Sequence, residues 1–136
     1  MKQTTLCYLE RDGQYLMLHR VKKEHDENHD KWIGVGGKFE DKESPEDCVR
    51  REVLEETGLR VKNLRYYKSQ PWSFSDTLLA GFYCDLDGSD AIRIEEDELS
   101  EALWLPRGEI PPRGNDVSLT AEMMERFRLG QDGLPV

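Results

Sequence analysis

Residues 37–59 read GKFEDKESPEDCVRREVLEETGL, and this stretch decides the fold. Three glutamates in it, Glu52, Glu55 and Glu56, stand at helical spacing, so that their carboxylates share one face. Like charges in that arrangement destabilise a helix unless a cation lies among them. Hard carboxylate oxygens suit Mg2+ or Mn2+, which keep bound waters and accept phosphate oxygens. The spacing therefore predicts a metal site, and a solvated acidic helix face is the alternative interpretation.

The residues around the glutamates predict a helix over residues 45–57. Ser44 is a good N-cap, and Pro45 suits the first turn of a helix. Gly58 is placed to end the helix, because glycine readily adopts the left-handed conformation found there. Val49 and Val53, with support from a neighbouring cysteine, supply a short apolar stripe for burial.

As a pattern, the stretch reads G-x5-E-x7-R-E-U-x-E-E-x-G-U, where U is an aliphatic residue. It resembles the complete signature of the Nudix hydrolase family. The matching residues are Gly37, Glu43, Arg51, Glu52, Val53, Glu55, Glu56, Gly58 and Leu59. The resemblance implies an α/β fold, an α/β/α sandwich with a mixed β-sheet between helices, in which this box forms a loop, a helix and a second loop.

The resemblance also implies roles for particular side chains. The expected metal ligands are Glu52, Glu55, Glu56 and the carbonyl near Gly37, with Mg2+ or Mn2+ as the ion. Glu52 is a general-base candidate, and Arg51 can tie Glu43 to the helix through a bidentate bond. Lys38 or Arg51 is expected to stabilise charge that develops on the phosphate.

In this family a further catalytic or metal-binding glutamate often comes from a distant loop. Glu98 stands where that residue is expected, six positions before Trp104. Its rivals in the same acidic stretch are Glu95, Glu96 and Glu101.

Composition limits the class of protein further. At 136 residues the chain is long enough for one domain with a proper core. It has no apolar run of about 18 residues and no signal-peptide core, so we expect a soluble, cytoplasmic protein. The net charge of −9 argues against binding to nucleic acids or to anionic membranes. Three scattered cysteines predict buried or idle thiols in a reducing compartment.

The rest of the chain predicts strands and one more helix. Expected strands cover residues 4–9, 14–20, 61–67, 78–85 and 102–105, the first two forming a hairpin. Residues 118–129 predict an amphipathic helix that packs on the core. His25 and His29 lie in a polar stretch, where a loop near the pocket mouth is favoured over a transition-metal site.

Residues 69–77, SQPWSFSDT, carry a hint about the substrate. They resemble the S-Q-P-W-P-F-P-x-S array of the NADH pyrophosphatases within the family. Trp72 and Phe74 offer flat faces on which a base can stack, and Gln70 can donate and accept hydrogen bonds. The alternative is that both aromatic side chains simply pack on the sheet. This array favours an NADH-like dinucleotide, with a nucleoside monophosphate as one product.

The first half of the chain points to a different substrate. Residues 4–40 are similar to MutT-type 8-oxo-dGTP diphosphatases, so hydrolysis of a nucleoside triphosphate is the first alternative. A non-catalytic nucleotide sensor on the same scaffold is the second alternative, because fold does not determine function. Members of the family are often dimers, and a homodimer is therefore expected as a possible assembly.

Overall fold

The computed structural model describes residues 2–20, 31–72, 77–93, 99–110, 114 and 118–132; of these, the side chains of residues 19–20, 31–33, 72 and 99–101 are not described. The strands are β1 (Lys2–Arg11), β2 (Gln14–Arg20), β3 (Lys31–Ile33), β4 (Val35–Lys38), β5 (Val61–Trp72), β6 (Thr77–Leu86) and β7 (Leu99–Pro106). The helices are α1 (Pro45–Thr57) and α2 (Leu119–Arg128), with a short 3-10 helix, η1 (Arg107–Glu109).

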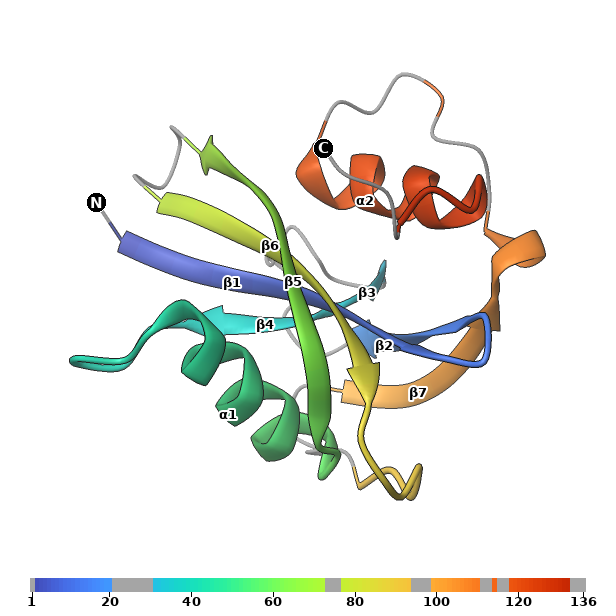
Figure 1. The fold of residues 1–136 in the computed structure, drawn as a ribbon, viewed down its shortest axis with the longest axis horizontal. Coiled ribbons are helices and arrows are strands. Elements are labelled where there is room, and N and C mark those ends of the chain that lie inside the picture. Colours follow the sequence, from blue (N-terminus) through green and yellow to red (C-terminus); the bar gives the residue numbers. More distant parts are fainter. Residues whose placement is uncertain are drawn as a thin grey trace.

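The strands form one mixed sheet in the order β3-β2-β1-β6-β5 (Figure 1). Off this path, β4 pairs with the first half of β1, and β7 pairs with β2. β1 and β6 run parallel, from the pair Lys2 and Thr77 to the pair Glu10 and Asp85. The other pairings are antiparallel. The mixed sheet confirms the α/β class expected from the sequence.

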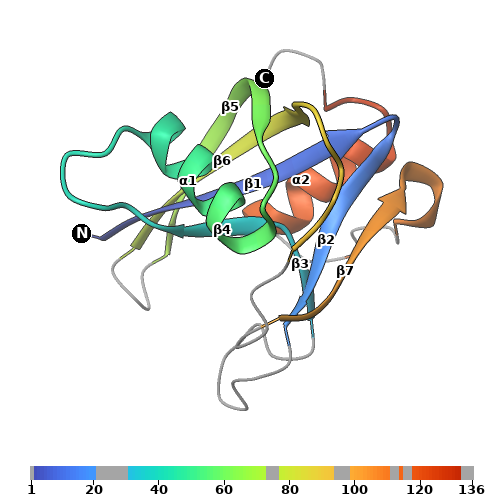
Figure 2. The ribbon, with the colours of Figure 1, turned by 90° about the horizontal axis from the view of Figure 1, so that it is seen from below.

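Helices α1 and α2 lie on opposite faces of the sheet (Figure 2). The sheet separates two cores, because successive side chains of a strand point to opposite faces. Along β1, Cys7 and Leu9 join the core that includes α1 residues. Leu6 and Tyr8 join the other core, which includes α2 residues. Each helix therefore buries its apolar stripe against one face of the sheet, as an α/β/α sandwich requires.

Helix α1 has the boundaries that its capping residues predict. The Ser44 side chain accepts a hydrogen bond from the amide of Asp47 (3.1 Å), which satisfies a free donor of the first turn. At the other end, Gly58 has φ of 74°, the left-handed conformation expected there. The amide of Arg93 donates to the carbonyl of Thr57 (2.8 Å), so the chain after β6 closes this end.

Helix α2 confirms the second amphipathic prediction. Leu119, Met123 and Phe127 are buried on its inner face. The ring of Phe127 stacks on that of Tyr15, with 3.5 Å between centroids. The Gln70 side-chain oxygen accepts a hydrogen bond from the amide of Leu119 (2.8 Å), so β5 is tied to the start of this helix.

Two segments differ from the sequence prediction. β5 continues beyond residue 67 to Trp72, because its backbone stays paired with β6 up to the pair Trp72 and Thr77. Residues 35–38, for which the sequence predicted no strand, form β4, and Leu6 pairs with Gly36. A Cβ atom at Gly36 would lie 2.1 Å from the carbonyl oxygen of Thr5, so this glycine permits close approach of two strands.

The cysteine prediction holds for burial, since Cys7, Cys48 and Cys84 are buried and free. Across the described part of the chain, no helix has the length and apolar character needed to cross a membrane. His25 and His29 lie outside the described residues.

Candidate active site

The carboxylates of the box are organised around the guanidinium of Arg51. Its Nε and Nη2 donate to the two carboxylate oxygens of Glu43 at 2.7 and 2.9 Å, the predicted bidentate pair. Its Nη1 donates to Glu52 (2.9 Å) and to Glu55 (3.1 Å). Its Nη2 also donates to the carbonyl of Lys38 (2.9 Å). Because arginine has five N–H donors, these five bonds use its full donor capacity.

The same hydrogen bonds fix the loop before α1. Glu43 accepts a hydrogen bond from the amide of Glu40 (3.0 Å) besides its two from Arg51. The hydrogen bonds from Arg51, more than any other cause, lower the pKa of Glu43 from 4.5 to about 2. The hydrogen bonds that Arg51 donates to Glu43, in turn, raise the pKa of Arg51 above its ordinary value. Arg51 is thus a positioning residue that joins loop and helix.

Glu52 lies where the loop backbone leaves room for it. A Cβ atom on Gly37 would lie 2.3 Å from the carboxyl carbon of Glu52, so only glycine fits at this position without moving the carboxylate. The side chain of Glu52 is 14% exposed. Burial is the main cause that raises its pKa, while Arg51 acts in the opposite direction.

The three glutamates differ in environment. Glu55 is exposed, whereas Glu52 and Glu56 are half-buried, and Glu52 lies against Gly37 and Arg51. Within the described residues, no three acidic, histidine or cysteine side chains are already gathered as a metal-binding group. The positive charge among the carboxylates is supplied by the Nη1 of Arg51.

The donor set nevertheless fits a hard divalent cation. Carboxylate oxygens at adjoining turns of one helix, beside the Gly37 backbone, are the ligands that Mg2+ and Mn2+ prefer. A cation at Glu52 and Glu55 would compete with the Nη1 of Arg51 for the same oxygens. The assignment of these glutamates as metal ligands stays a prediction.

Several predicted site residues fall outside the described part. These are Phe74, Glu98 and its rivals Glu95 and Glu96, together with the side chains of Trp72 and Glu101. Lys38 is exposed next to the box glycine, and its carbonyl is held by Arg51. Gln70 lies on β5, where its side-chain oxygen holds the α2 N-terminus. The site brings together Gly37, Lys38, Glu43 and Arg51 with the three helix glutamates.

Sequence reasoning missed one pair of residues that support the loop. The sulfur of Cys48 lies 3.3 Å from the hydroxyl of Thr5 on β1, and both residues are buried. The same sulfur lies 3.8 Å from the carbonyl of Gly37 and 3.7 Å from that of Lys38. The sequence marked Cys48 only as apolar, because a thiol contact between a helix and a distant strand leaves no periodic signal.

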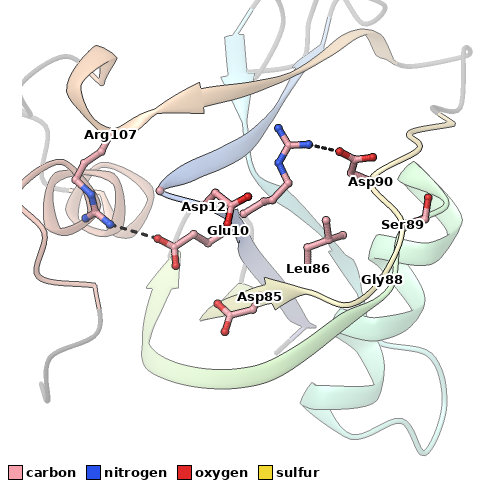
Figure 3. A pocket seen from close by; sticks show the side chains of 10 residues that line it. Glu10, Asp12, Asp85, Leu86, Gly88, Ser89, Asp90 and Arg107 are labelled. Carbon is pink, nitrogen blue, oxygen red and sulfur yellow. Dashed lines mark hydrogen bonds and ion pairs between the residues drawn. The ribbon is translucent and has the colours of Figure 1, made fainter.

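A larger cleft, of about 720 Å3, lies at the hairpin end of β1 (Figure 3). Its ends are lined by ion pairs between Arg11 and Asp90 and between Arg107 and Glu10. Glu10 is five strand positions beyond Thr5, which pairs with Gly37 of the box, roughly 17 Å away. The cleft therefore lies apart from the carboxylates of the box.

A family-level match supports the assignment made from the box. A sequence profile of the NUDIX domain matches residues 2–127. The chain belongs to the Nudix hydrolase family.

Particular relatives add detail. The "NAD-capped RNA hydrolase NudC" of Actinobacillus succinogenes is 49% identical over 84 residues, which cover 59% of this chain and 31% of that protein. The protein of the same name from Haemophilus influenzae (strain PittEE) is 37% identical over 108 residues, covering 76% of this chain and 40% of that one. The chain thus spans less than half the length of the curated relatives it matches.

Solved structures agree on the fold. A NUDIX hydrolase from Nitrosomonas europaea superimposes with a TM-score of 0.80 at 21% identity, covering 99% of this chain and 74% of that chain. A MutT NUDIX hydrolase from Burkholderia pseudomallei superimposes with a TM-score of 0.69 at 18% identity, covering 92% of this chain and 95% of that chain. At such identities the similarity establishes the architecture alone.

The lowered pKa of Glu43 predicts a pH dependence of stability. Glu43 holds its proton less tightly in the folded protein than in the unfolded chain, so it stabilises the fold above about pH 4.5. That stabilisation is lost as the pH falls toward 2. We expect Glu43→Gln to lose less thermal stability than the wild type over this range, as measured by circular dichroism. Glu109→Gln, at an exposed carboxylate, is the matched control. Parallel curves for Glu43→Gln and wild type would contradict the role of the Arg51 pair.

The enclosed position of Glu52 predicts an effect of Gly37→Ala on metal binding. The new methyl group displaces the Glu52 carboxylate, which is the end of a flexible side chain, so the protein still folds. We expect Mn2+ affinity, measured by electron paramagnetic resonance, to fall at least about tenfold, because ligand geometry is lost. Gly108→Ala is the control, since its Cβ would meet no atom within 4 Å. Equal Mn2+ affinity in the two variants would remove Gly37 from the metal site.

Proposed function

We propose that the protein is a Mg2+-dependent (or Mn2+-dependent) hydrolase that cleaves the diphosphate linkage of a nucleoside diphosphate derivative. The observation that carries the proposal is the placement of Glu52 between Gly37 and Arg51, at the centre of a complete box. Glu55 and Glu56 on the same helix face complete the proposed ligand set, with Glu98 as the additional glutamate. A bound divalent ion neutralises the diphosphate and lowers the pKa of an attacking water.

The residues of the chain then have distinct roles. Glu52 takes the proton of the attacking water, because its carboxylate lies at the centre of the box beside Gly37. Attack on one phosphorus breaks the bridging phosphorus–oxygen bond and releases a nucleoside monophosphate. Arg51 has all its donors engaged with the protein, so it keeps Glu43, Glu52 and the loop in place. Lys38, exposed on that loop, is the remaining cationic candidate for contact with phosphate oxygens.

The favoured substrate is an NADH-like dinucleotide. The relatives that carry the name NAD-capped RNA hydrolase match this chain at 37–49% identity, which supports recognition of an NAD-type group. The S-Q-P-W motif, residues 69–72, lies at the end of β5. In this proposal Trp72 and Phe74 stack on a base, and Gln70 contributes its amide nitrogen while its oxygen stays on α2.

Two other substrate classes remain specific alternatives. The relatives' name places NAD at the end of an RNA, whereas the net charge of −9 opposes contact with a long polyanion. The similarity of the first half to MutT-type enzymes favours a nucleoside triphosphate such as 8-oxo-dGTP. Both classes share the diphosphate chemistry, but they release different products. Analysis of the products therefore distinguishes them.

Replacement of the proposed base tests the reaction. We expect Glu52→Gln to lower kcat with Mg2+ by at least about 100-fold, because general-base catalysis contributes about that factor or more. Thermal unfolding should stay close to that of the wild type. Glu109→Gln, an exposed carboxylate outside the box, should keep full turnover. Full activity of Glu52→Gln would exclude this residue as base, and no turnover of any nucleotide by the wild type would favour a nucleotide sensor.

A substrate panel tests the specificity. NADH, NAD+, ADP-ribose, NAD-capped RNA, dGTP and 8-oxo-dGTP are compared in Mg2+, with the released monophosphate or pyrophosphate identified. We expect the highest kcat/KM for NADH, and we expect Trp72→Ala to raise KM for NADH at least about fivefold, since base stacking is lost. KM for 8-oxo-dGTP should change less. An equal rise for both substrates would remove Trp72 from base recognition.

A further inference from the structure

Two cysteines on neighbouring strands meet inside the protein. Cys7 lies on β1 and Cys84 on β6, and the two strands run parallel. Cys7 pairs with Phe82 and Leu9 pairs with Cys84, so the cysteines are diagonal neighbours whose side chains point to the same face. Their sulfur atoms lie 2.6 Å apart. Non-bonded carbon atoms keep about 3.5–4.0 Å between them, so this is a very close approach for two sulfur atoms.

The surrounding sheet and core hold this thiol pair together. Cys7 is 1% exposed, Cys84 is fully buried, and both belong to the core on the α1 side. At Cys7, β1 is paired with β4 on one side and with β6 on the other. β6 in turn lies between β1 and β5. Because a disulfide has about 2.0 Å between its sulfur atoms, a small rotation of the two side chains is enough to reach it.

Cys48 is in a different environment from this pair. Its sulfur contacts the hydroxyl of Thr5 at 3.3 Å and the carbonyls of the box loop. Burial raises the pKa of the Cys84 thiol, so its reactive thiolate forms rarely and bulky reagents react slowly. A peroxide is a small oxidant that suits an enclosed site. We propose that Cys7 and Cys84 form an intramolecular disulfide that locks β1 to β6 when the protein is exposed to a peroxide.

The oxidation of the pair uses one peroxide molecule. The sulfur of one cysteine loses its proton and attacks a peroxide oxygen, the oxygen–oxygen bond breaks, and a sulfenic acid and one water are formed. The sulfur of the second cysteine then attacks the sulfenic sulfur. The sulfur–sulfur bond forms, the sulfur–oxygen bond breaks, and the hydroxyl leaves as water with the proton of the second thiol. The two thiols together lose two electrons, which reduce hydrogen peroxide to two waters.

The bond changes stability because its ends are far apart in the sequence. It joins positions separated by 77 residues, and a cross-link over so long a loop restricts the unfolded chain more than the folded one. The folded protein already holds the two sulfur atoms close together. We therefore expect the oxidised protein to unfold at a higher temperature than the reduced protein.

The experiment treats the folded full chain with hydrogen peroxide, without metal or nucleotide, so its result is independent of the proposed hydrolysis. We expect peptide mapping by mass spectrometry to recover the peptides of Cys7 and Cys84 joined by a bond that dithiothreitol cleaves. Tm, measured by circular dichroism, should rise by at least about 5 °C on oxidation. Cys48→Ala, which keeps the pair, should show the same rise, whereas Cys84→Ala should show none.

Three outcomes would overturn the proposal. The first is folded wild-type protein in which Cys7 and Cys84 are not joined after peroxide treatment. The second is a disulfide that involves Cys48 or links two copies of the chain. The third is a Tm that stays the same or falls once the bond between Cys7 and Cys84 has formed, which would exclude the lock between the strands. Because the mapping and the Tm comparison use the wild type, they decide the question even if Cys84→Ala does not fold.

Discussion

The structure of the box depends on one cation that is shared by several carboxylates. Arg51 uses all five of its donors on Glu43, Glu52, Glu55 and the carbonyl of Lys38. A helix with three glutamates on one face would otherwise be destabilised by their repulsion. The arginine thus offsets a local electrostatic cost, and at the same time it fixes the distance between the loop and the helix.

The two-sided sheet provides the rigid support for that arrangement. Strand β1 is central, because residues 4–7 pair with β4, its last two residues pair with β2, and most of its length pairs with β6. Its alternating side chains contribute to both cores. The box loop leaves the sheet directly from β4, so it starts from a backbone held on one side by β1. A site built on such a base keeps its carboxylates in place better than one on a free loop.

The sequence was sufficient for the features that depend on local chemistry. The capping residues gave both ends of α1, and the bidentate pair of Arg51 with Glu43 followed from their types and spacing. Features that depend on distant partners were not predictable. Gly36 carries no local signal of a strand, and only the pairing of β4 with β1 shows that it makes room for Thr5. Likewise Gln70 reads as a substrate contact, although its oxygen holds the start of α2.

The parallel pairing of β1 with β6 has a consequence for the order of folding. The pair Lys2 and Thr77 joins positions about 75 residues apart, and contacts of such long range slow folding. On a ribosome that adds about 5–20 residues per second, β1 would wait roughly 4–15 s for its parallel neighbour. During that time an apolar strand edge is exposed, and chaperones act on surfaces of this kind.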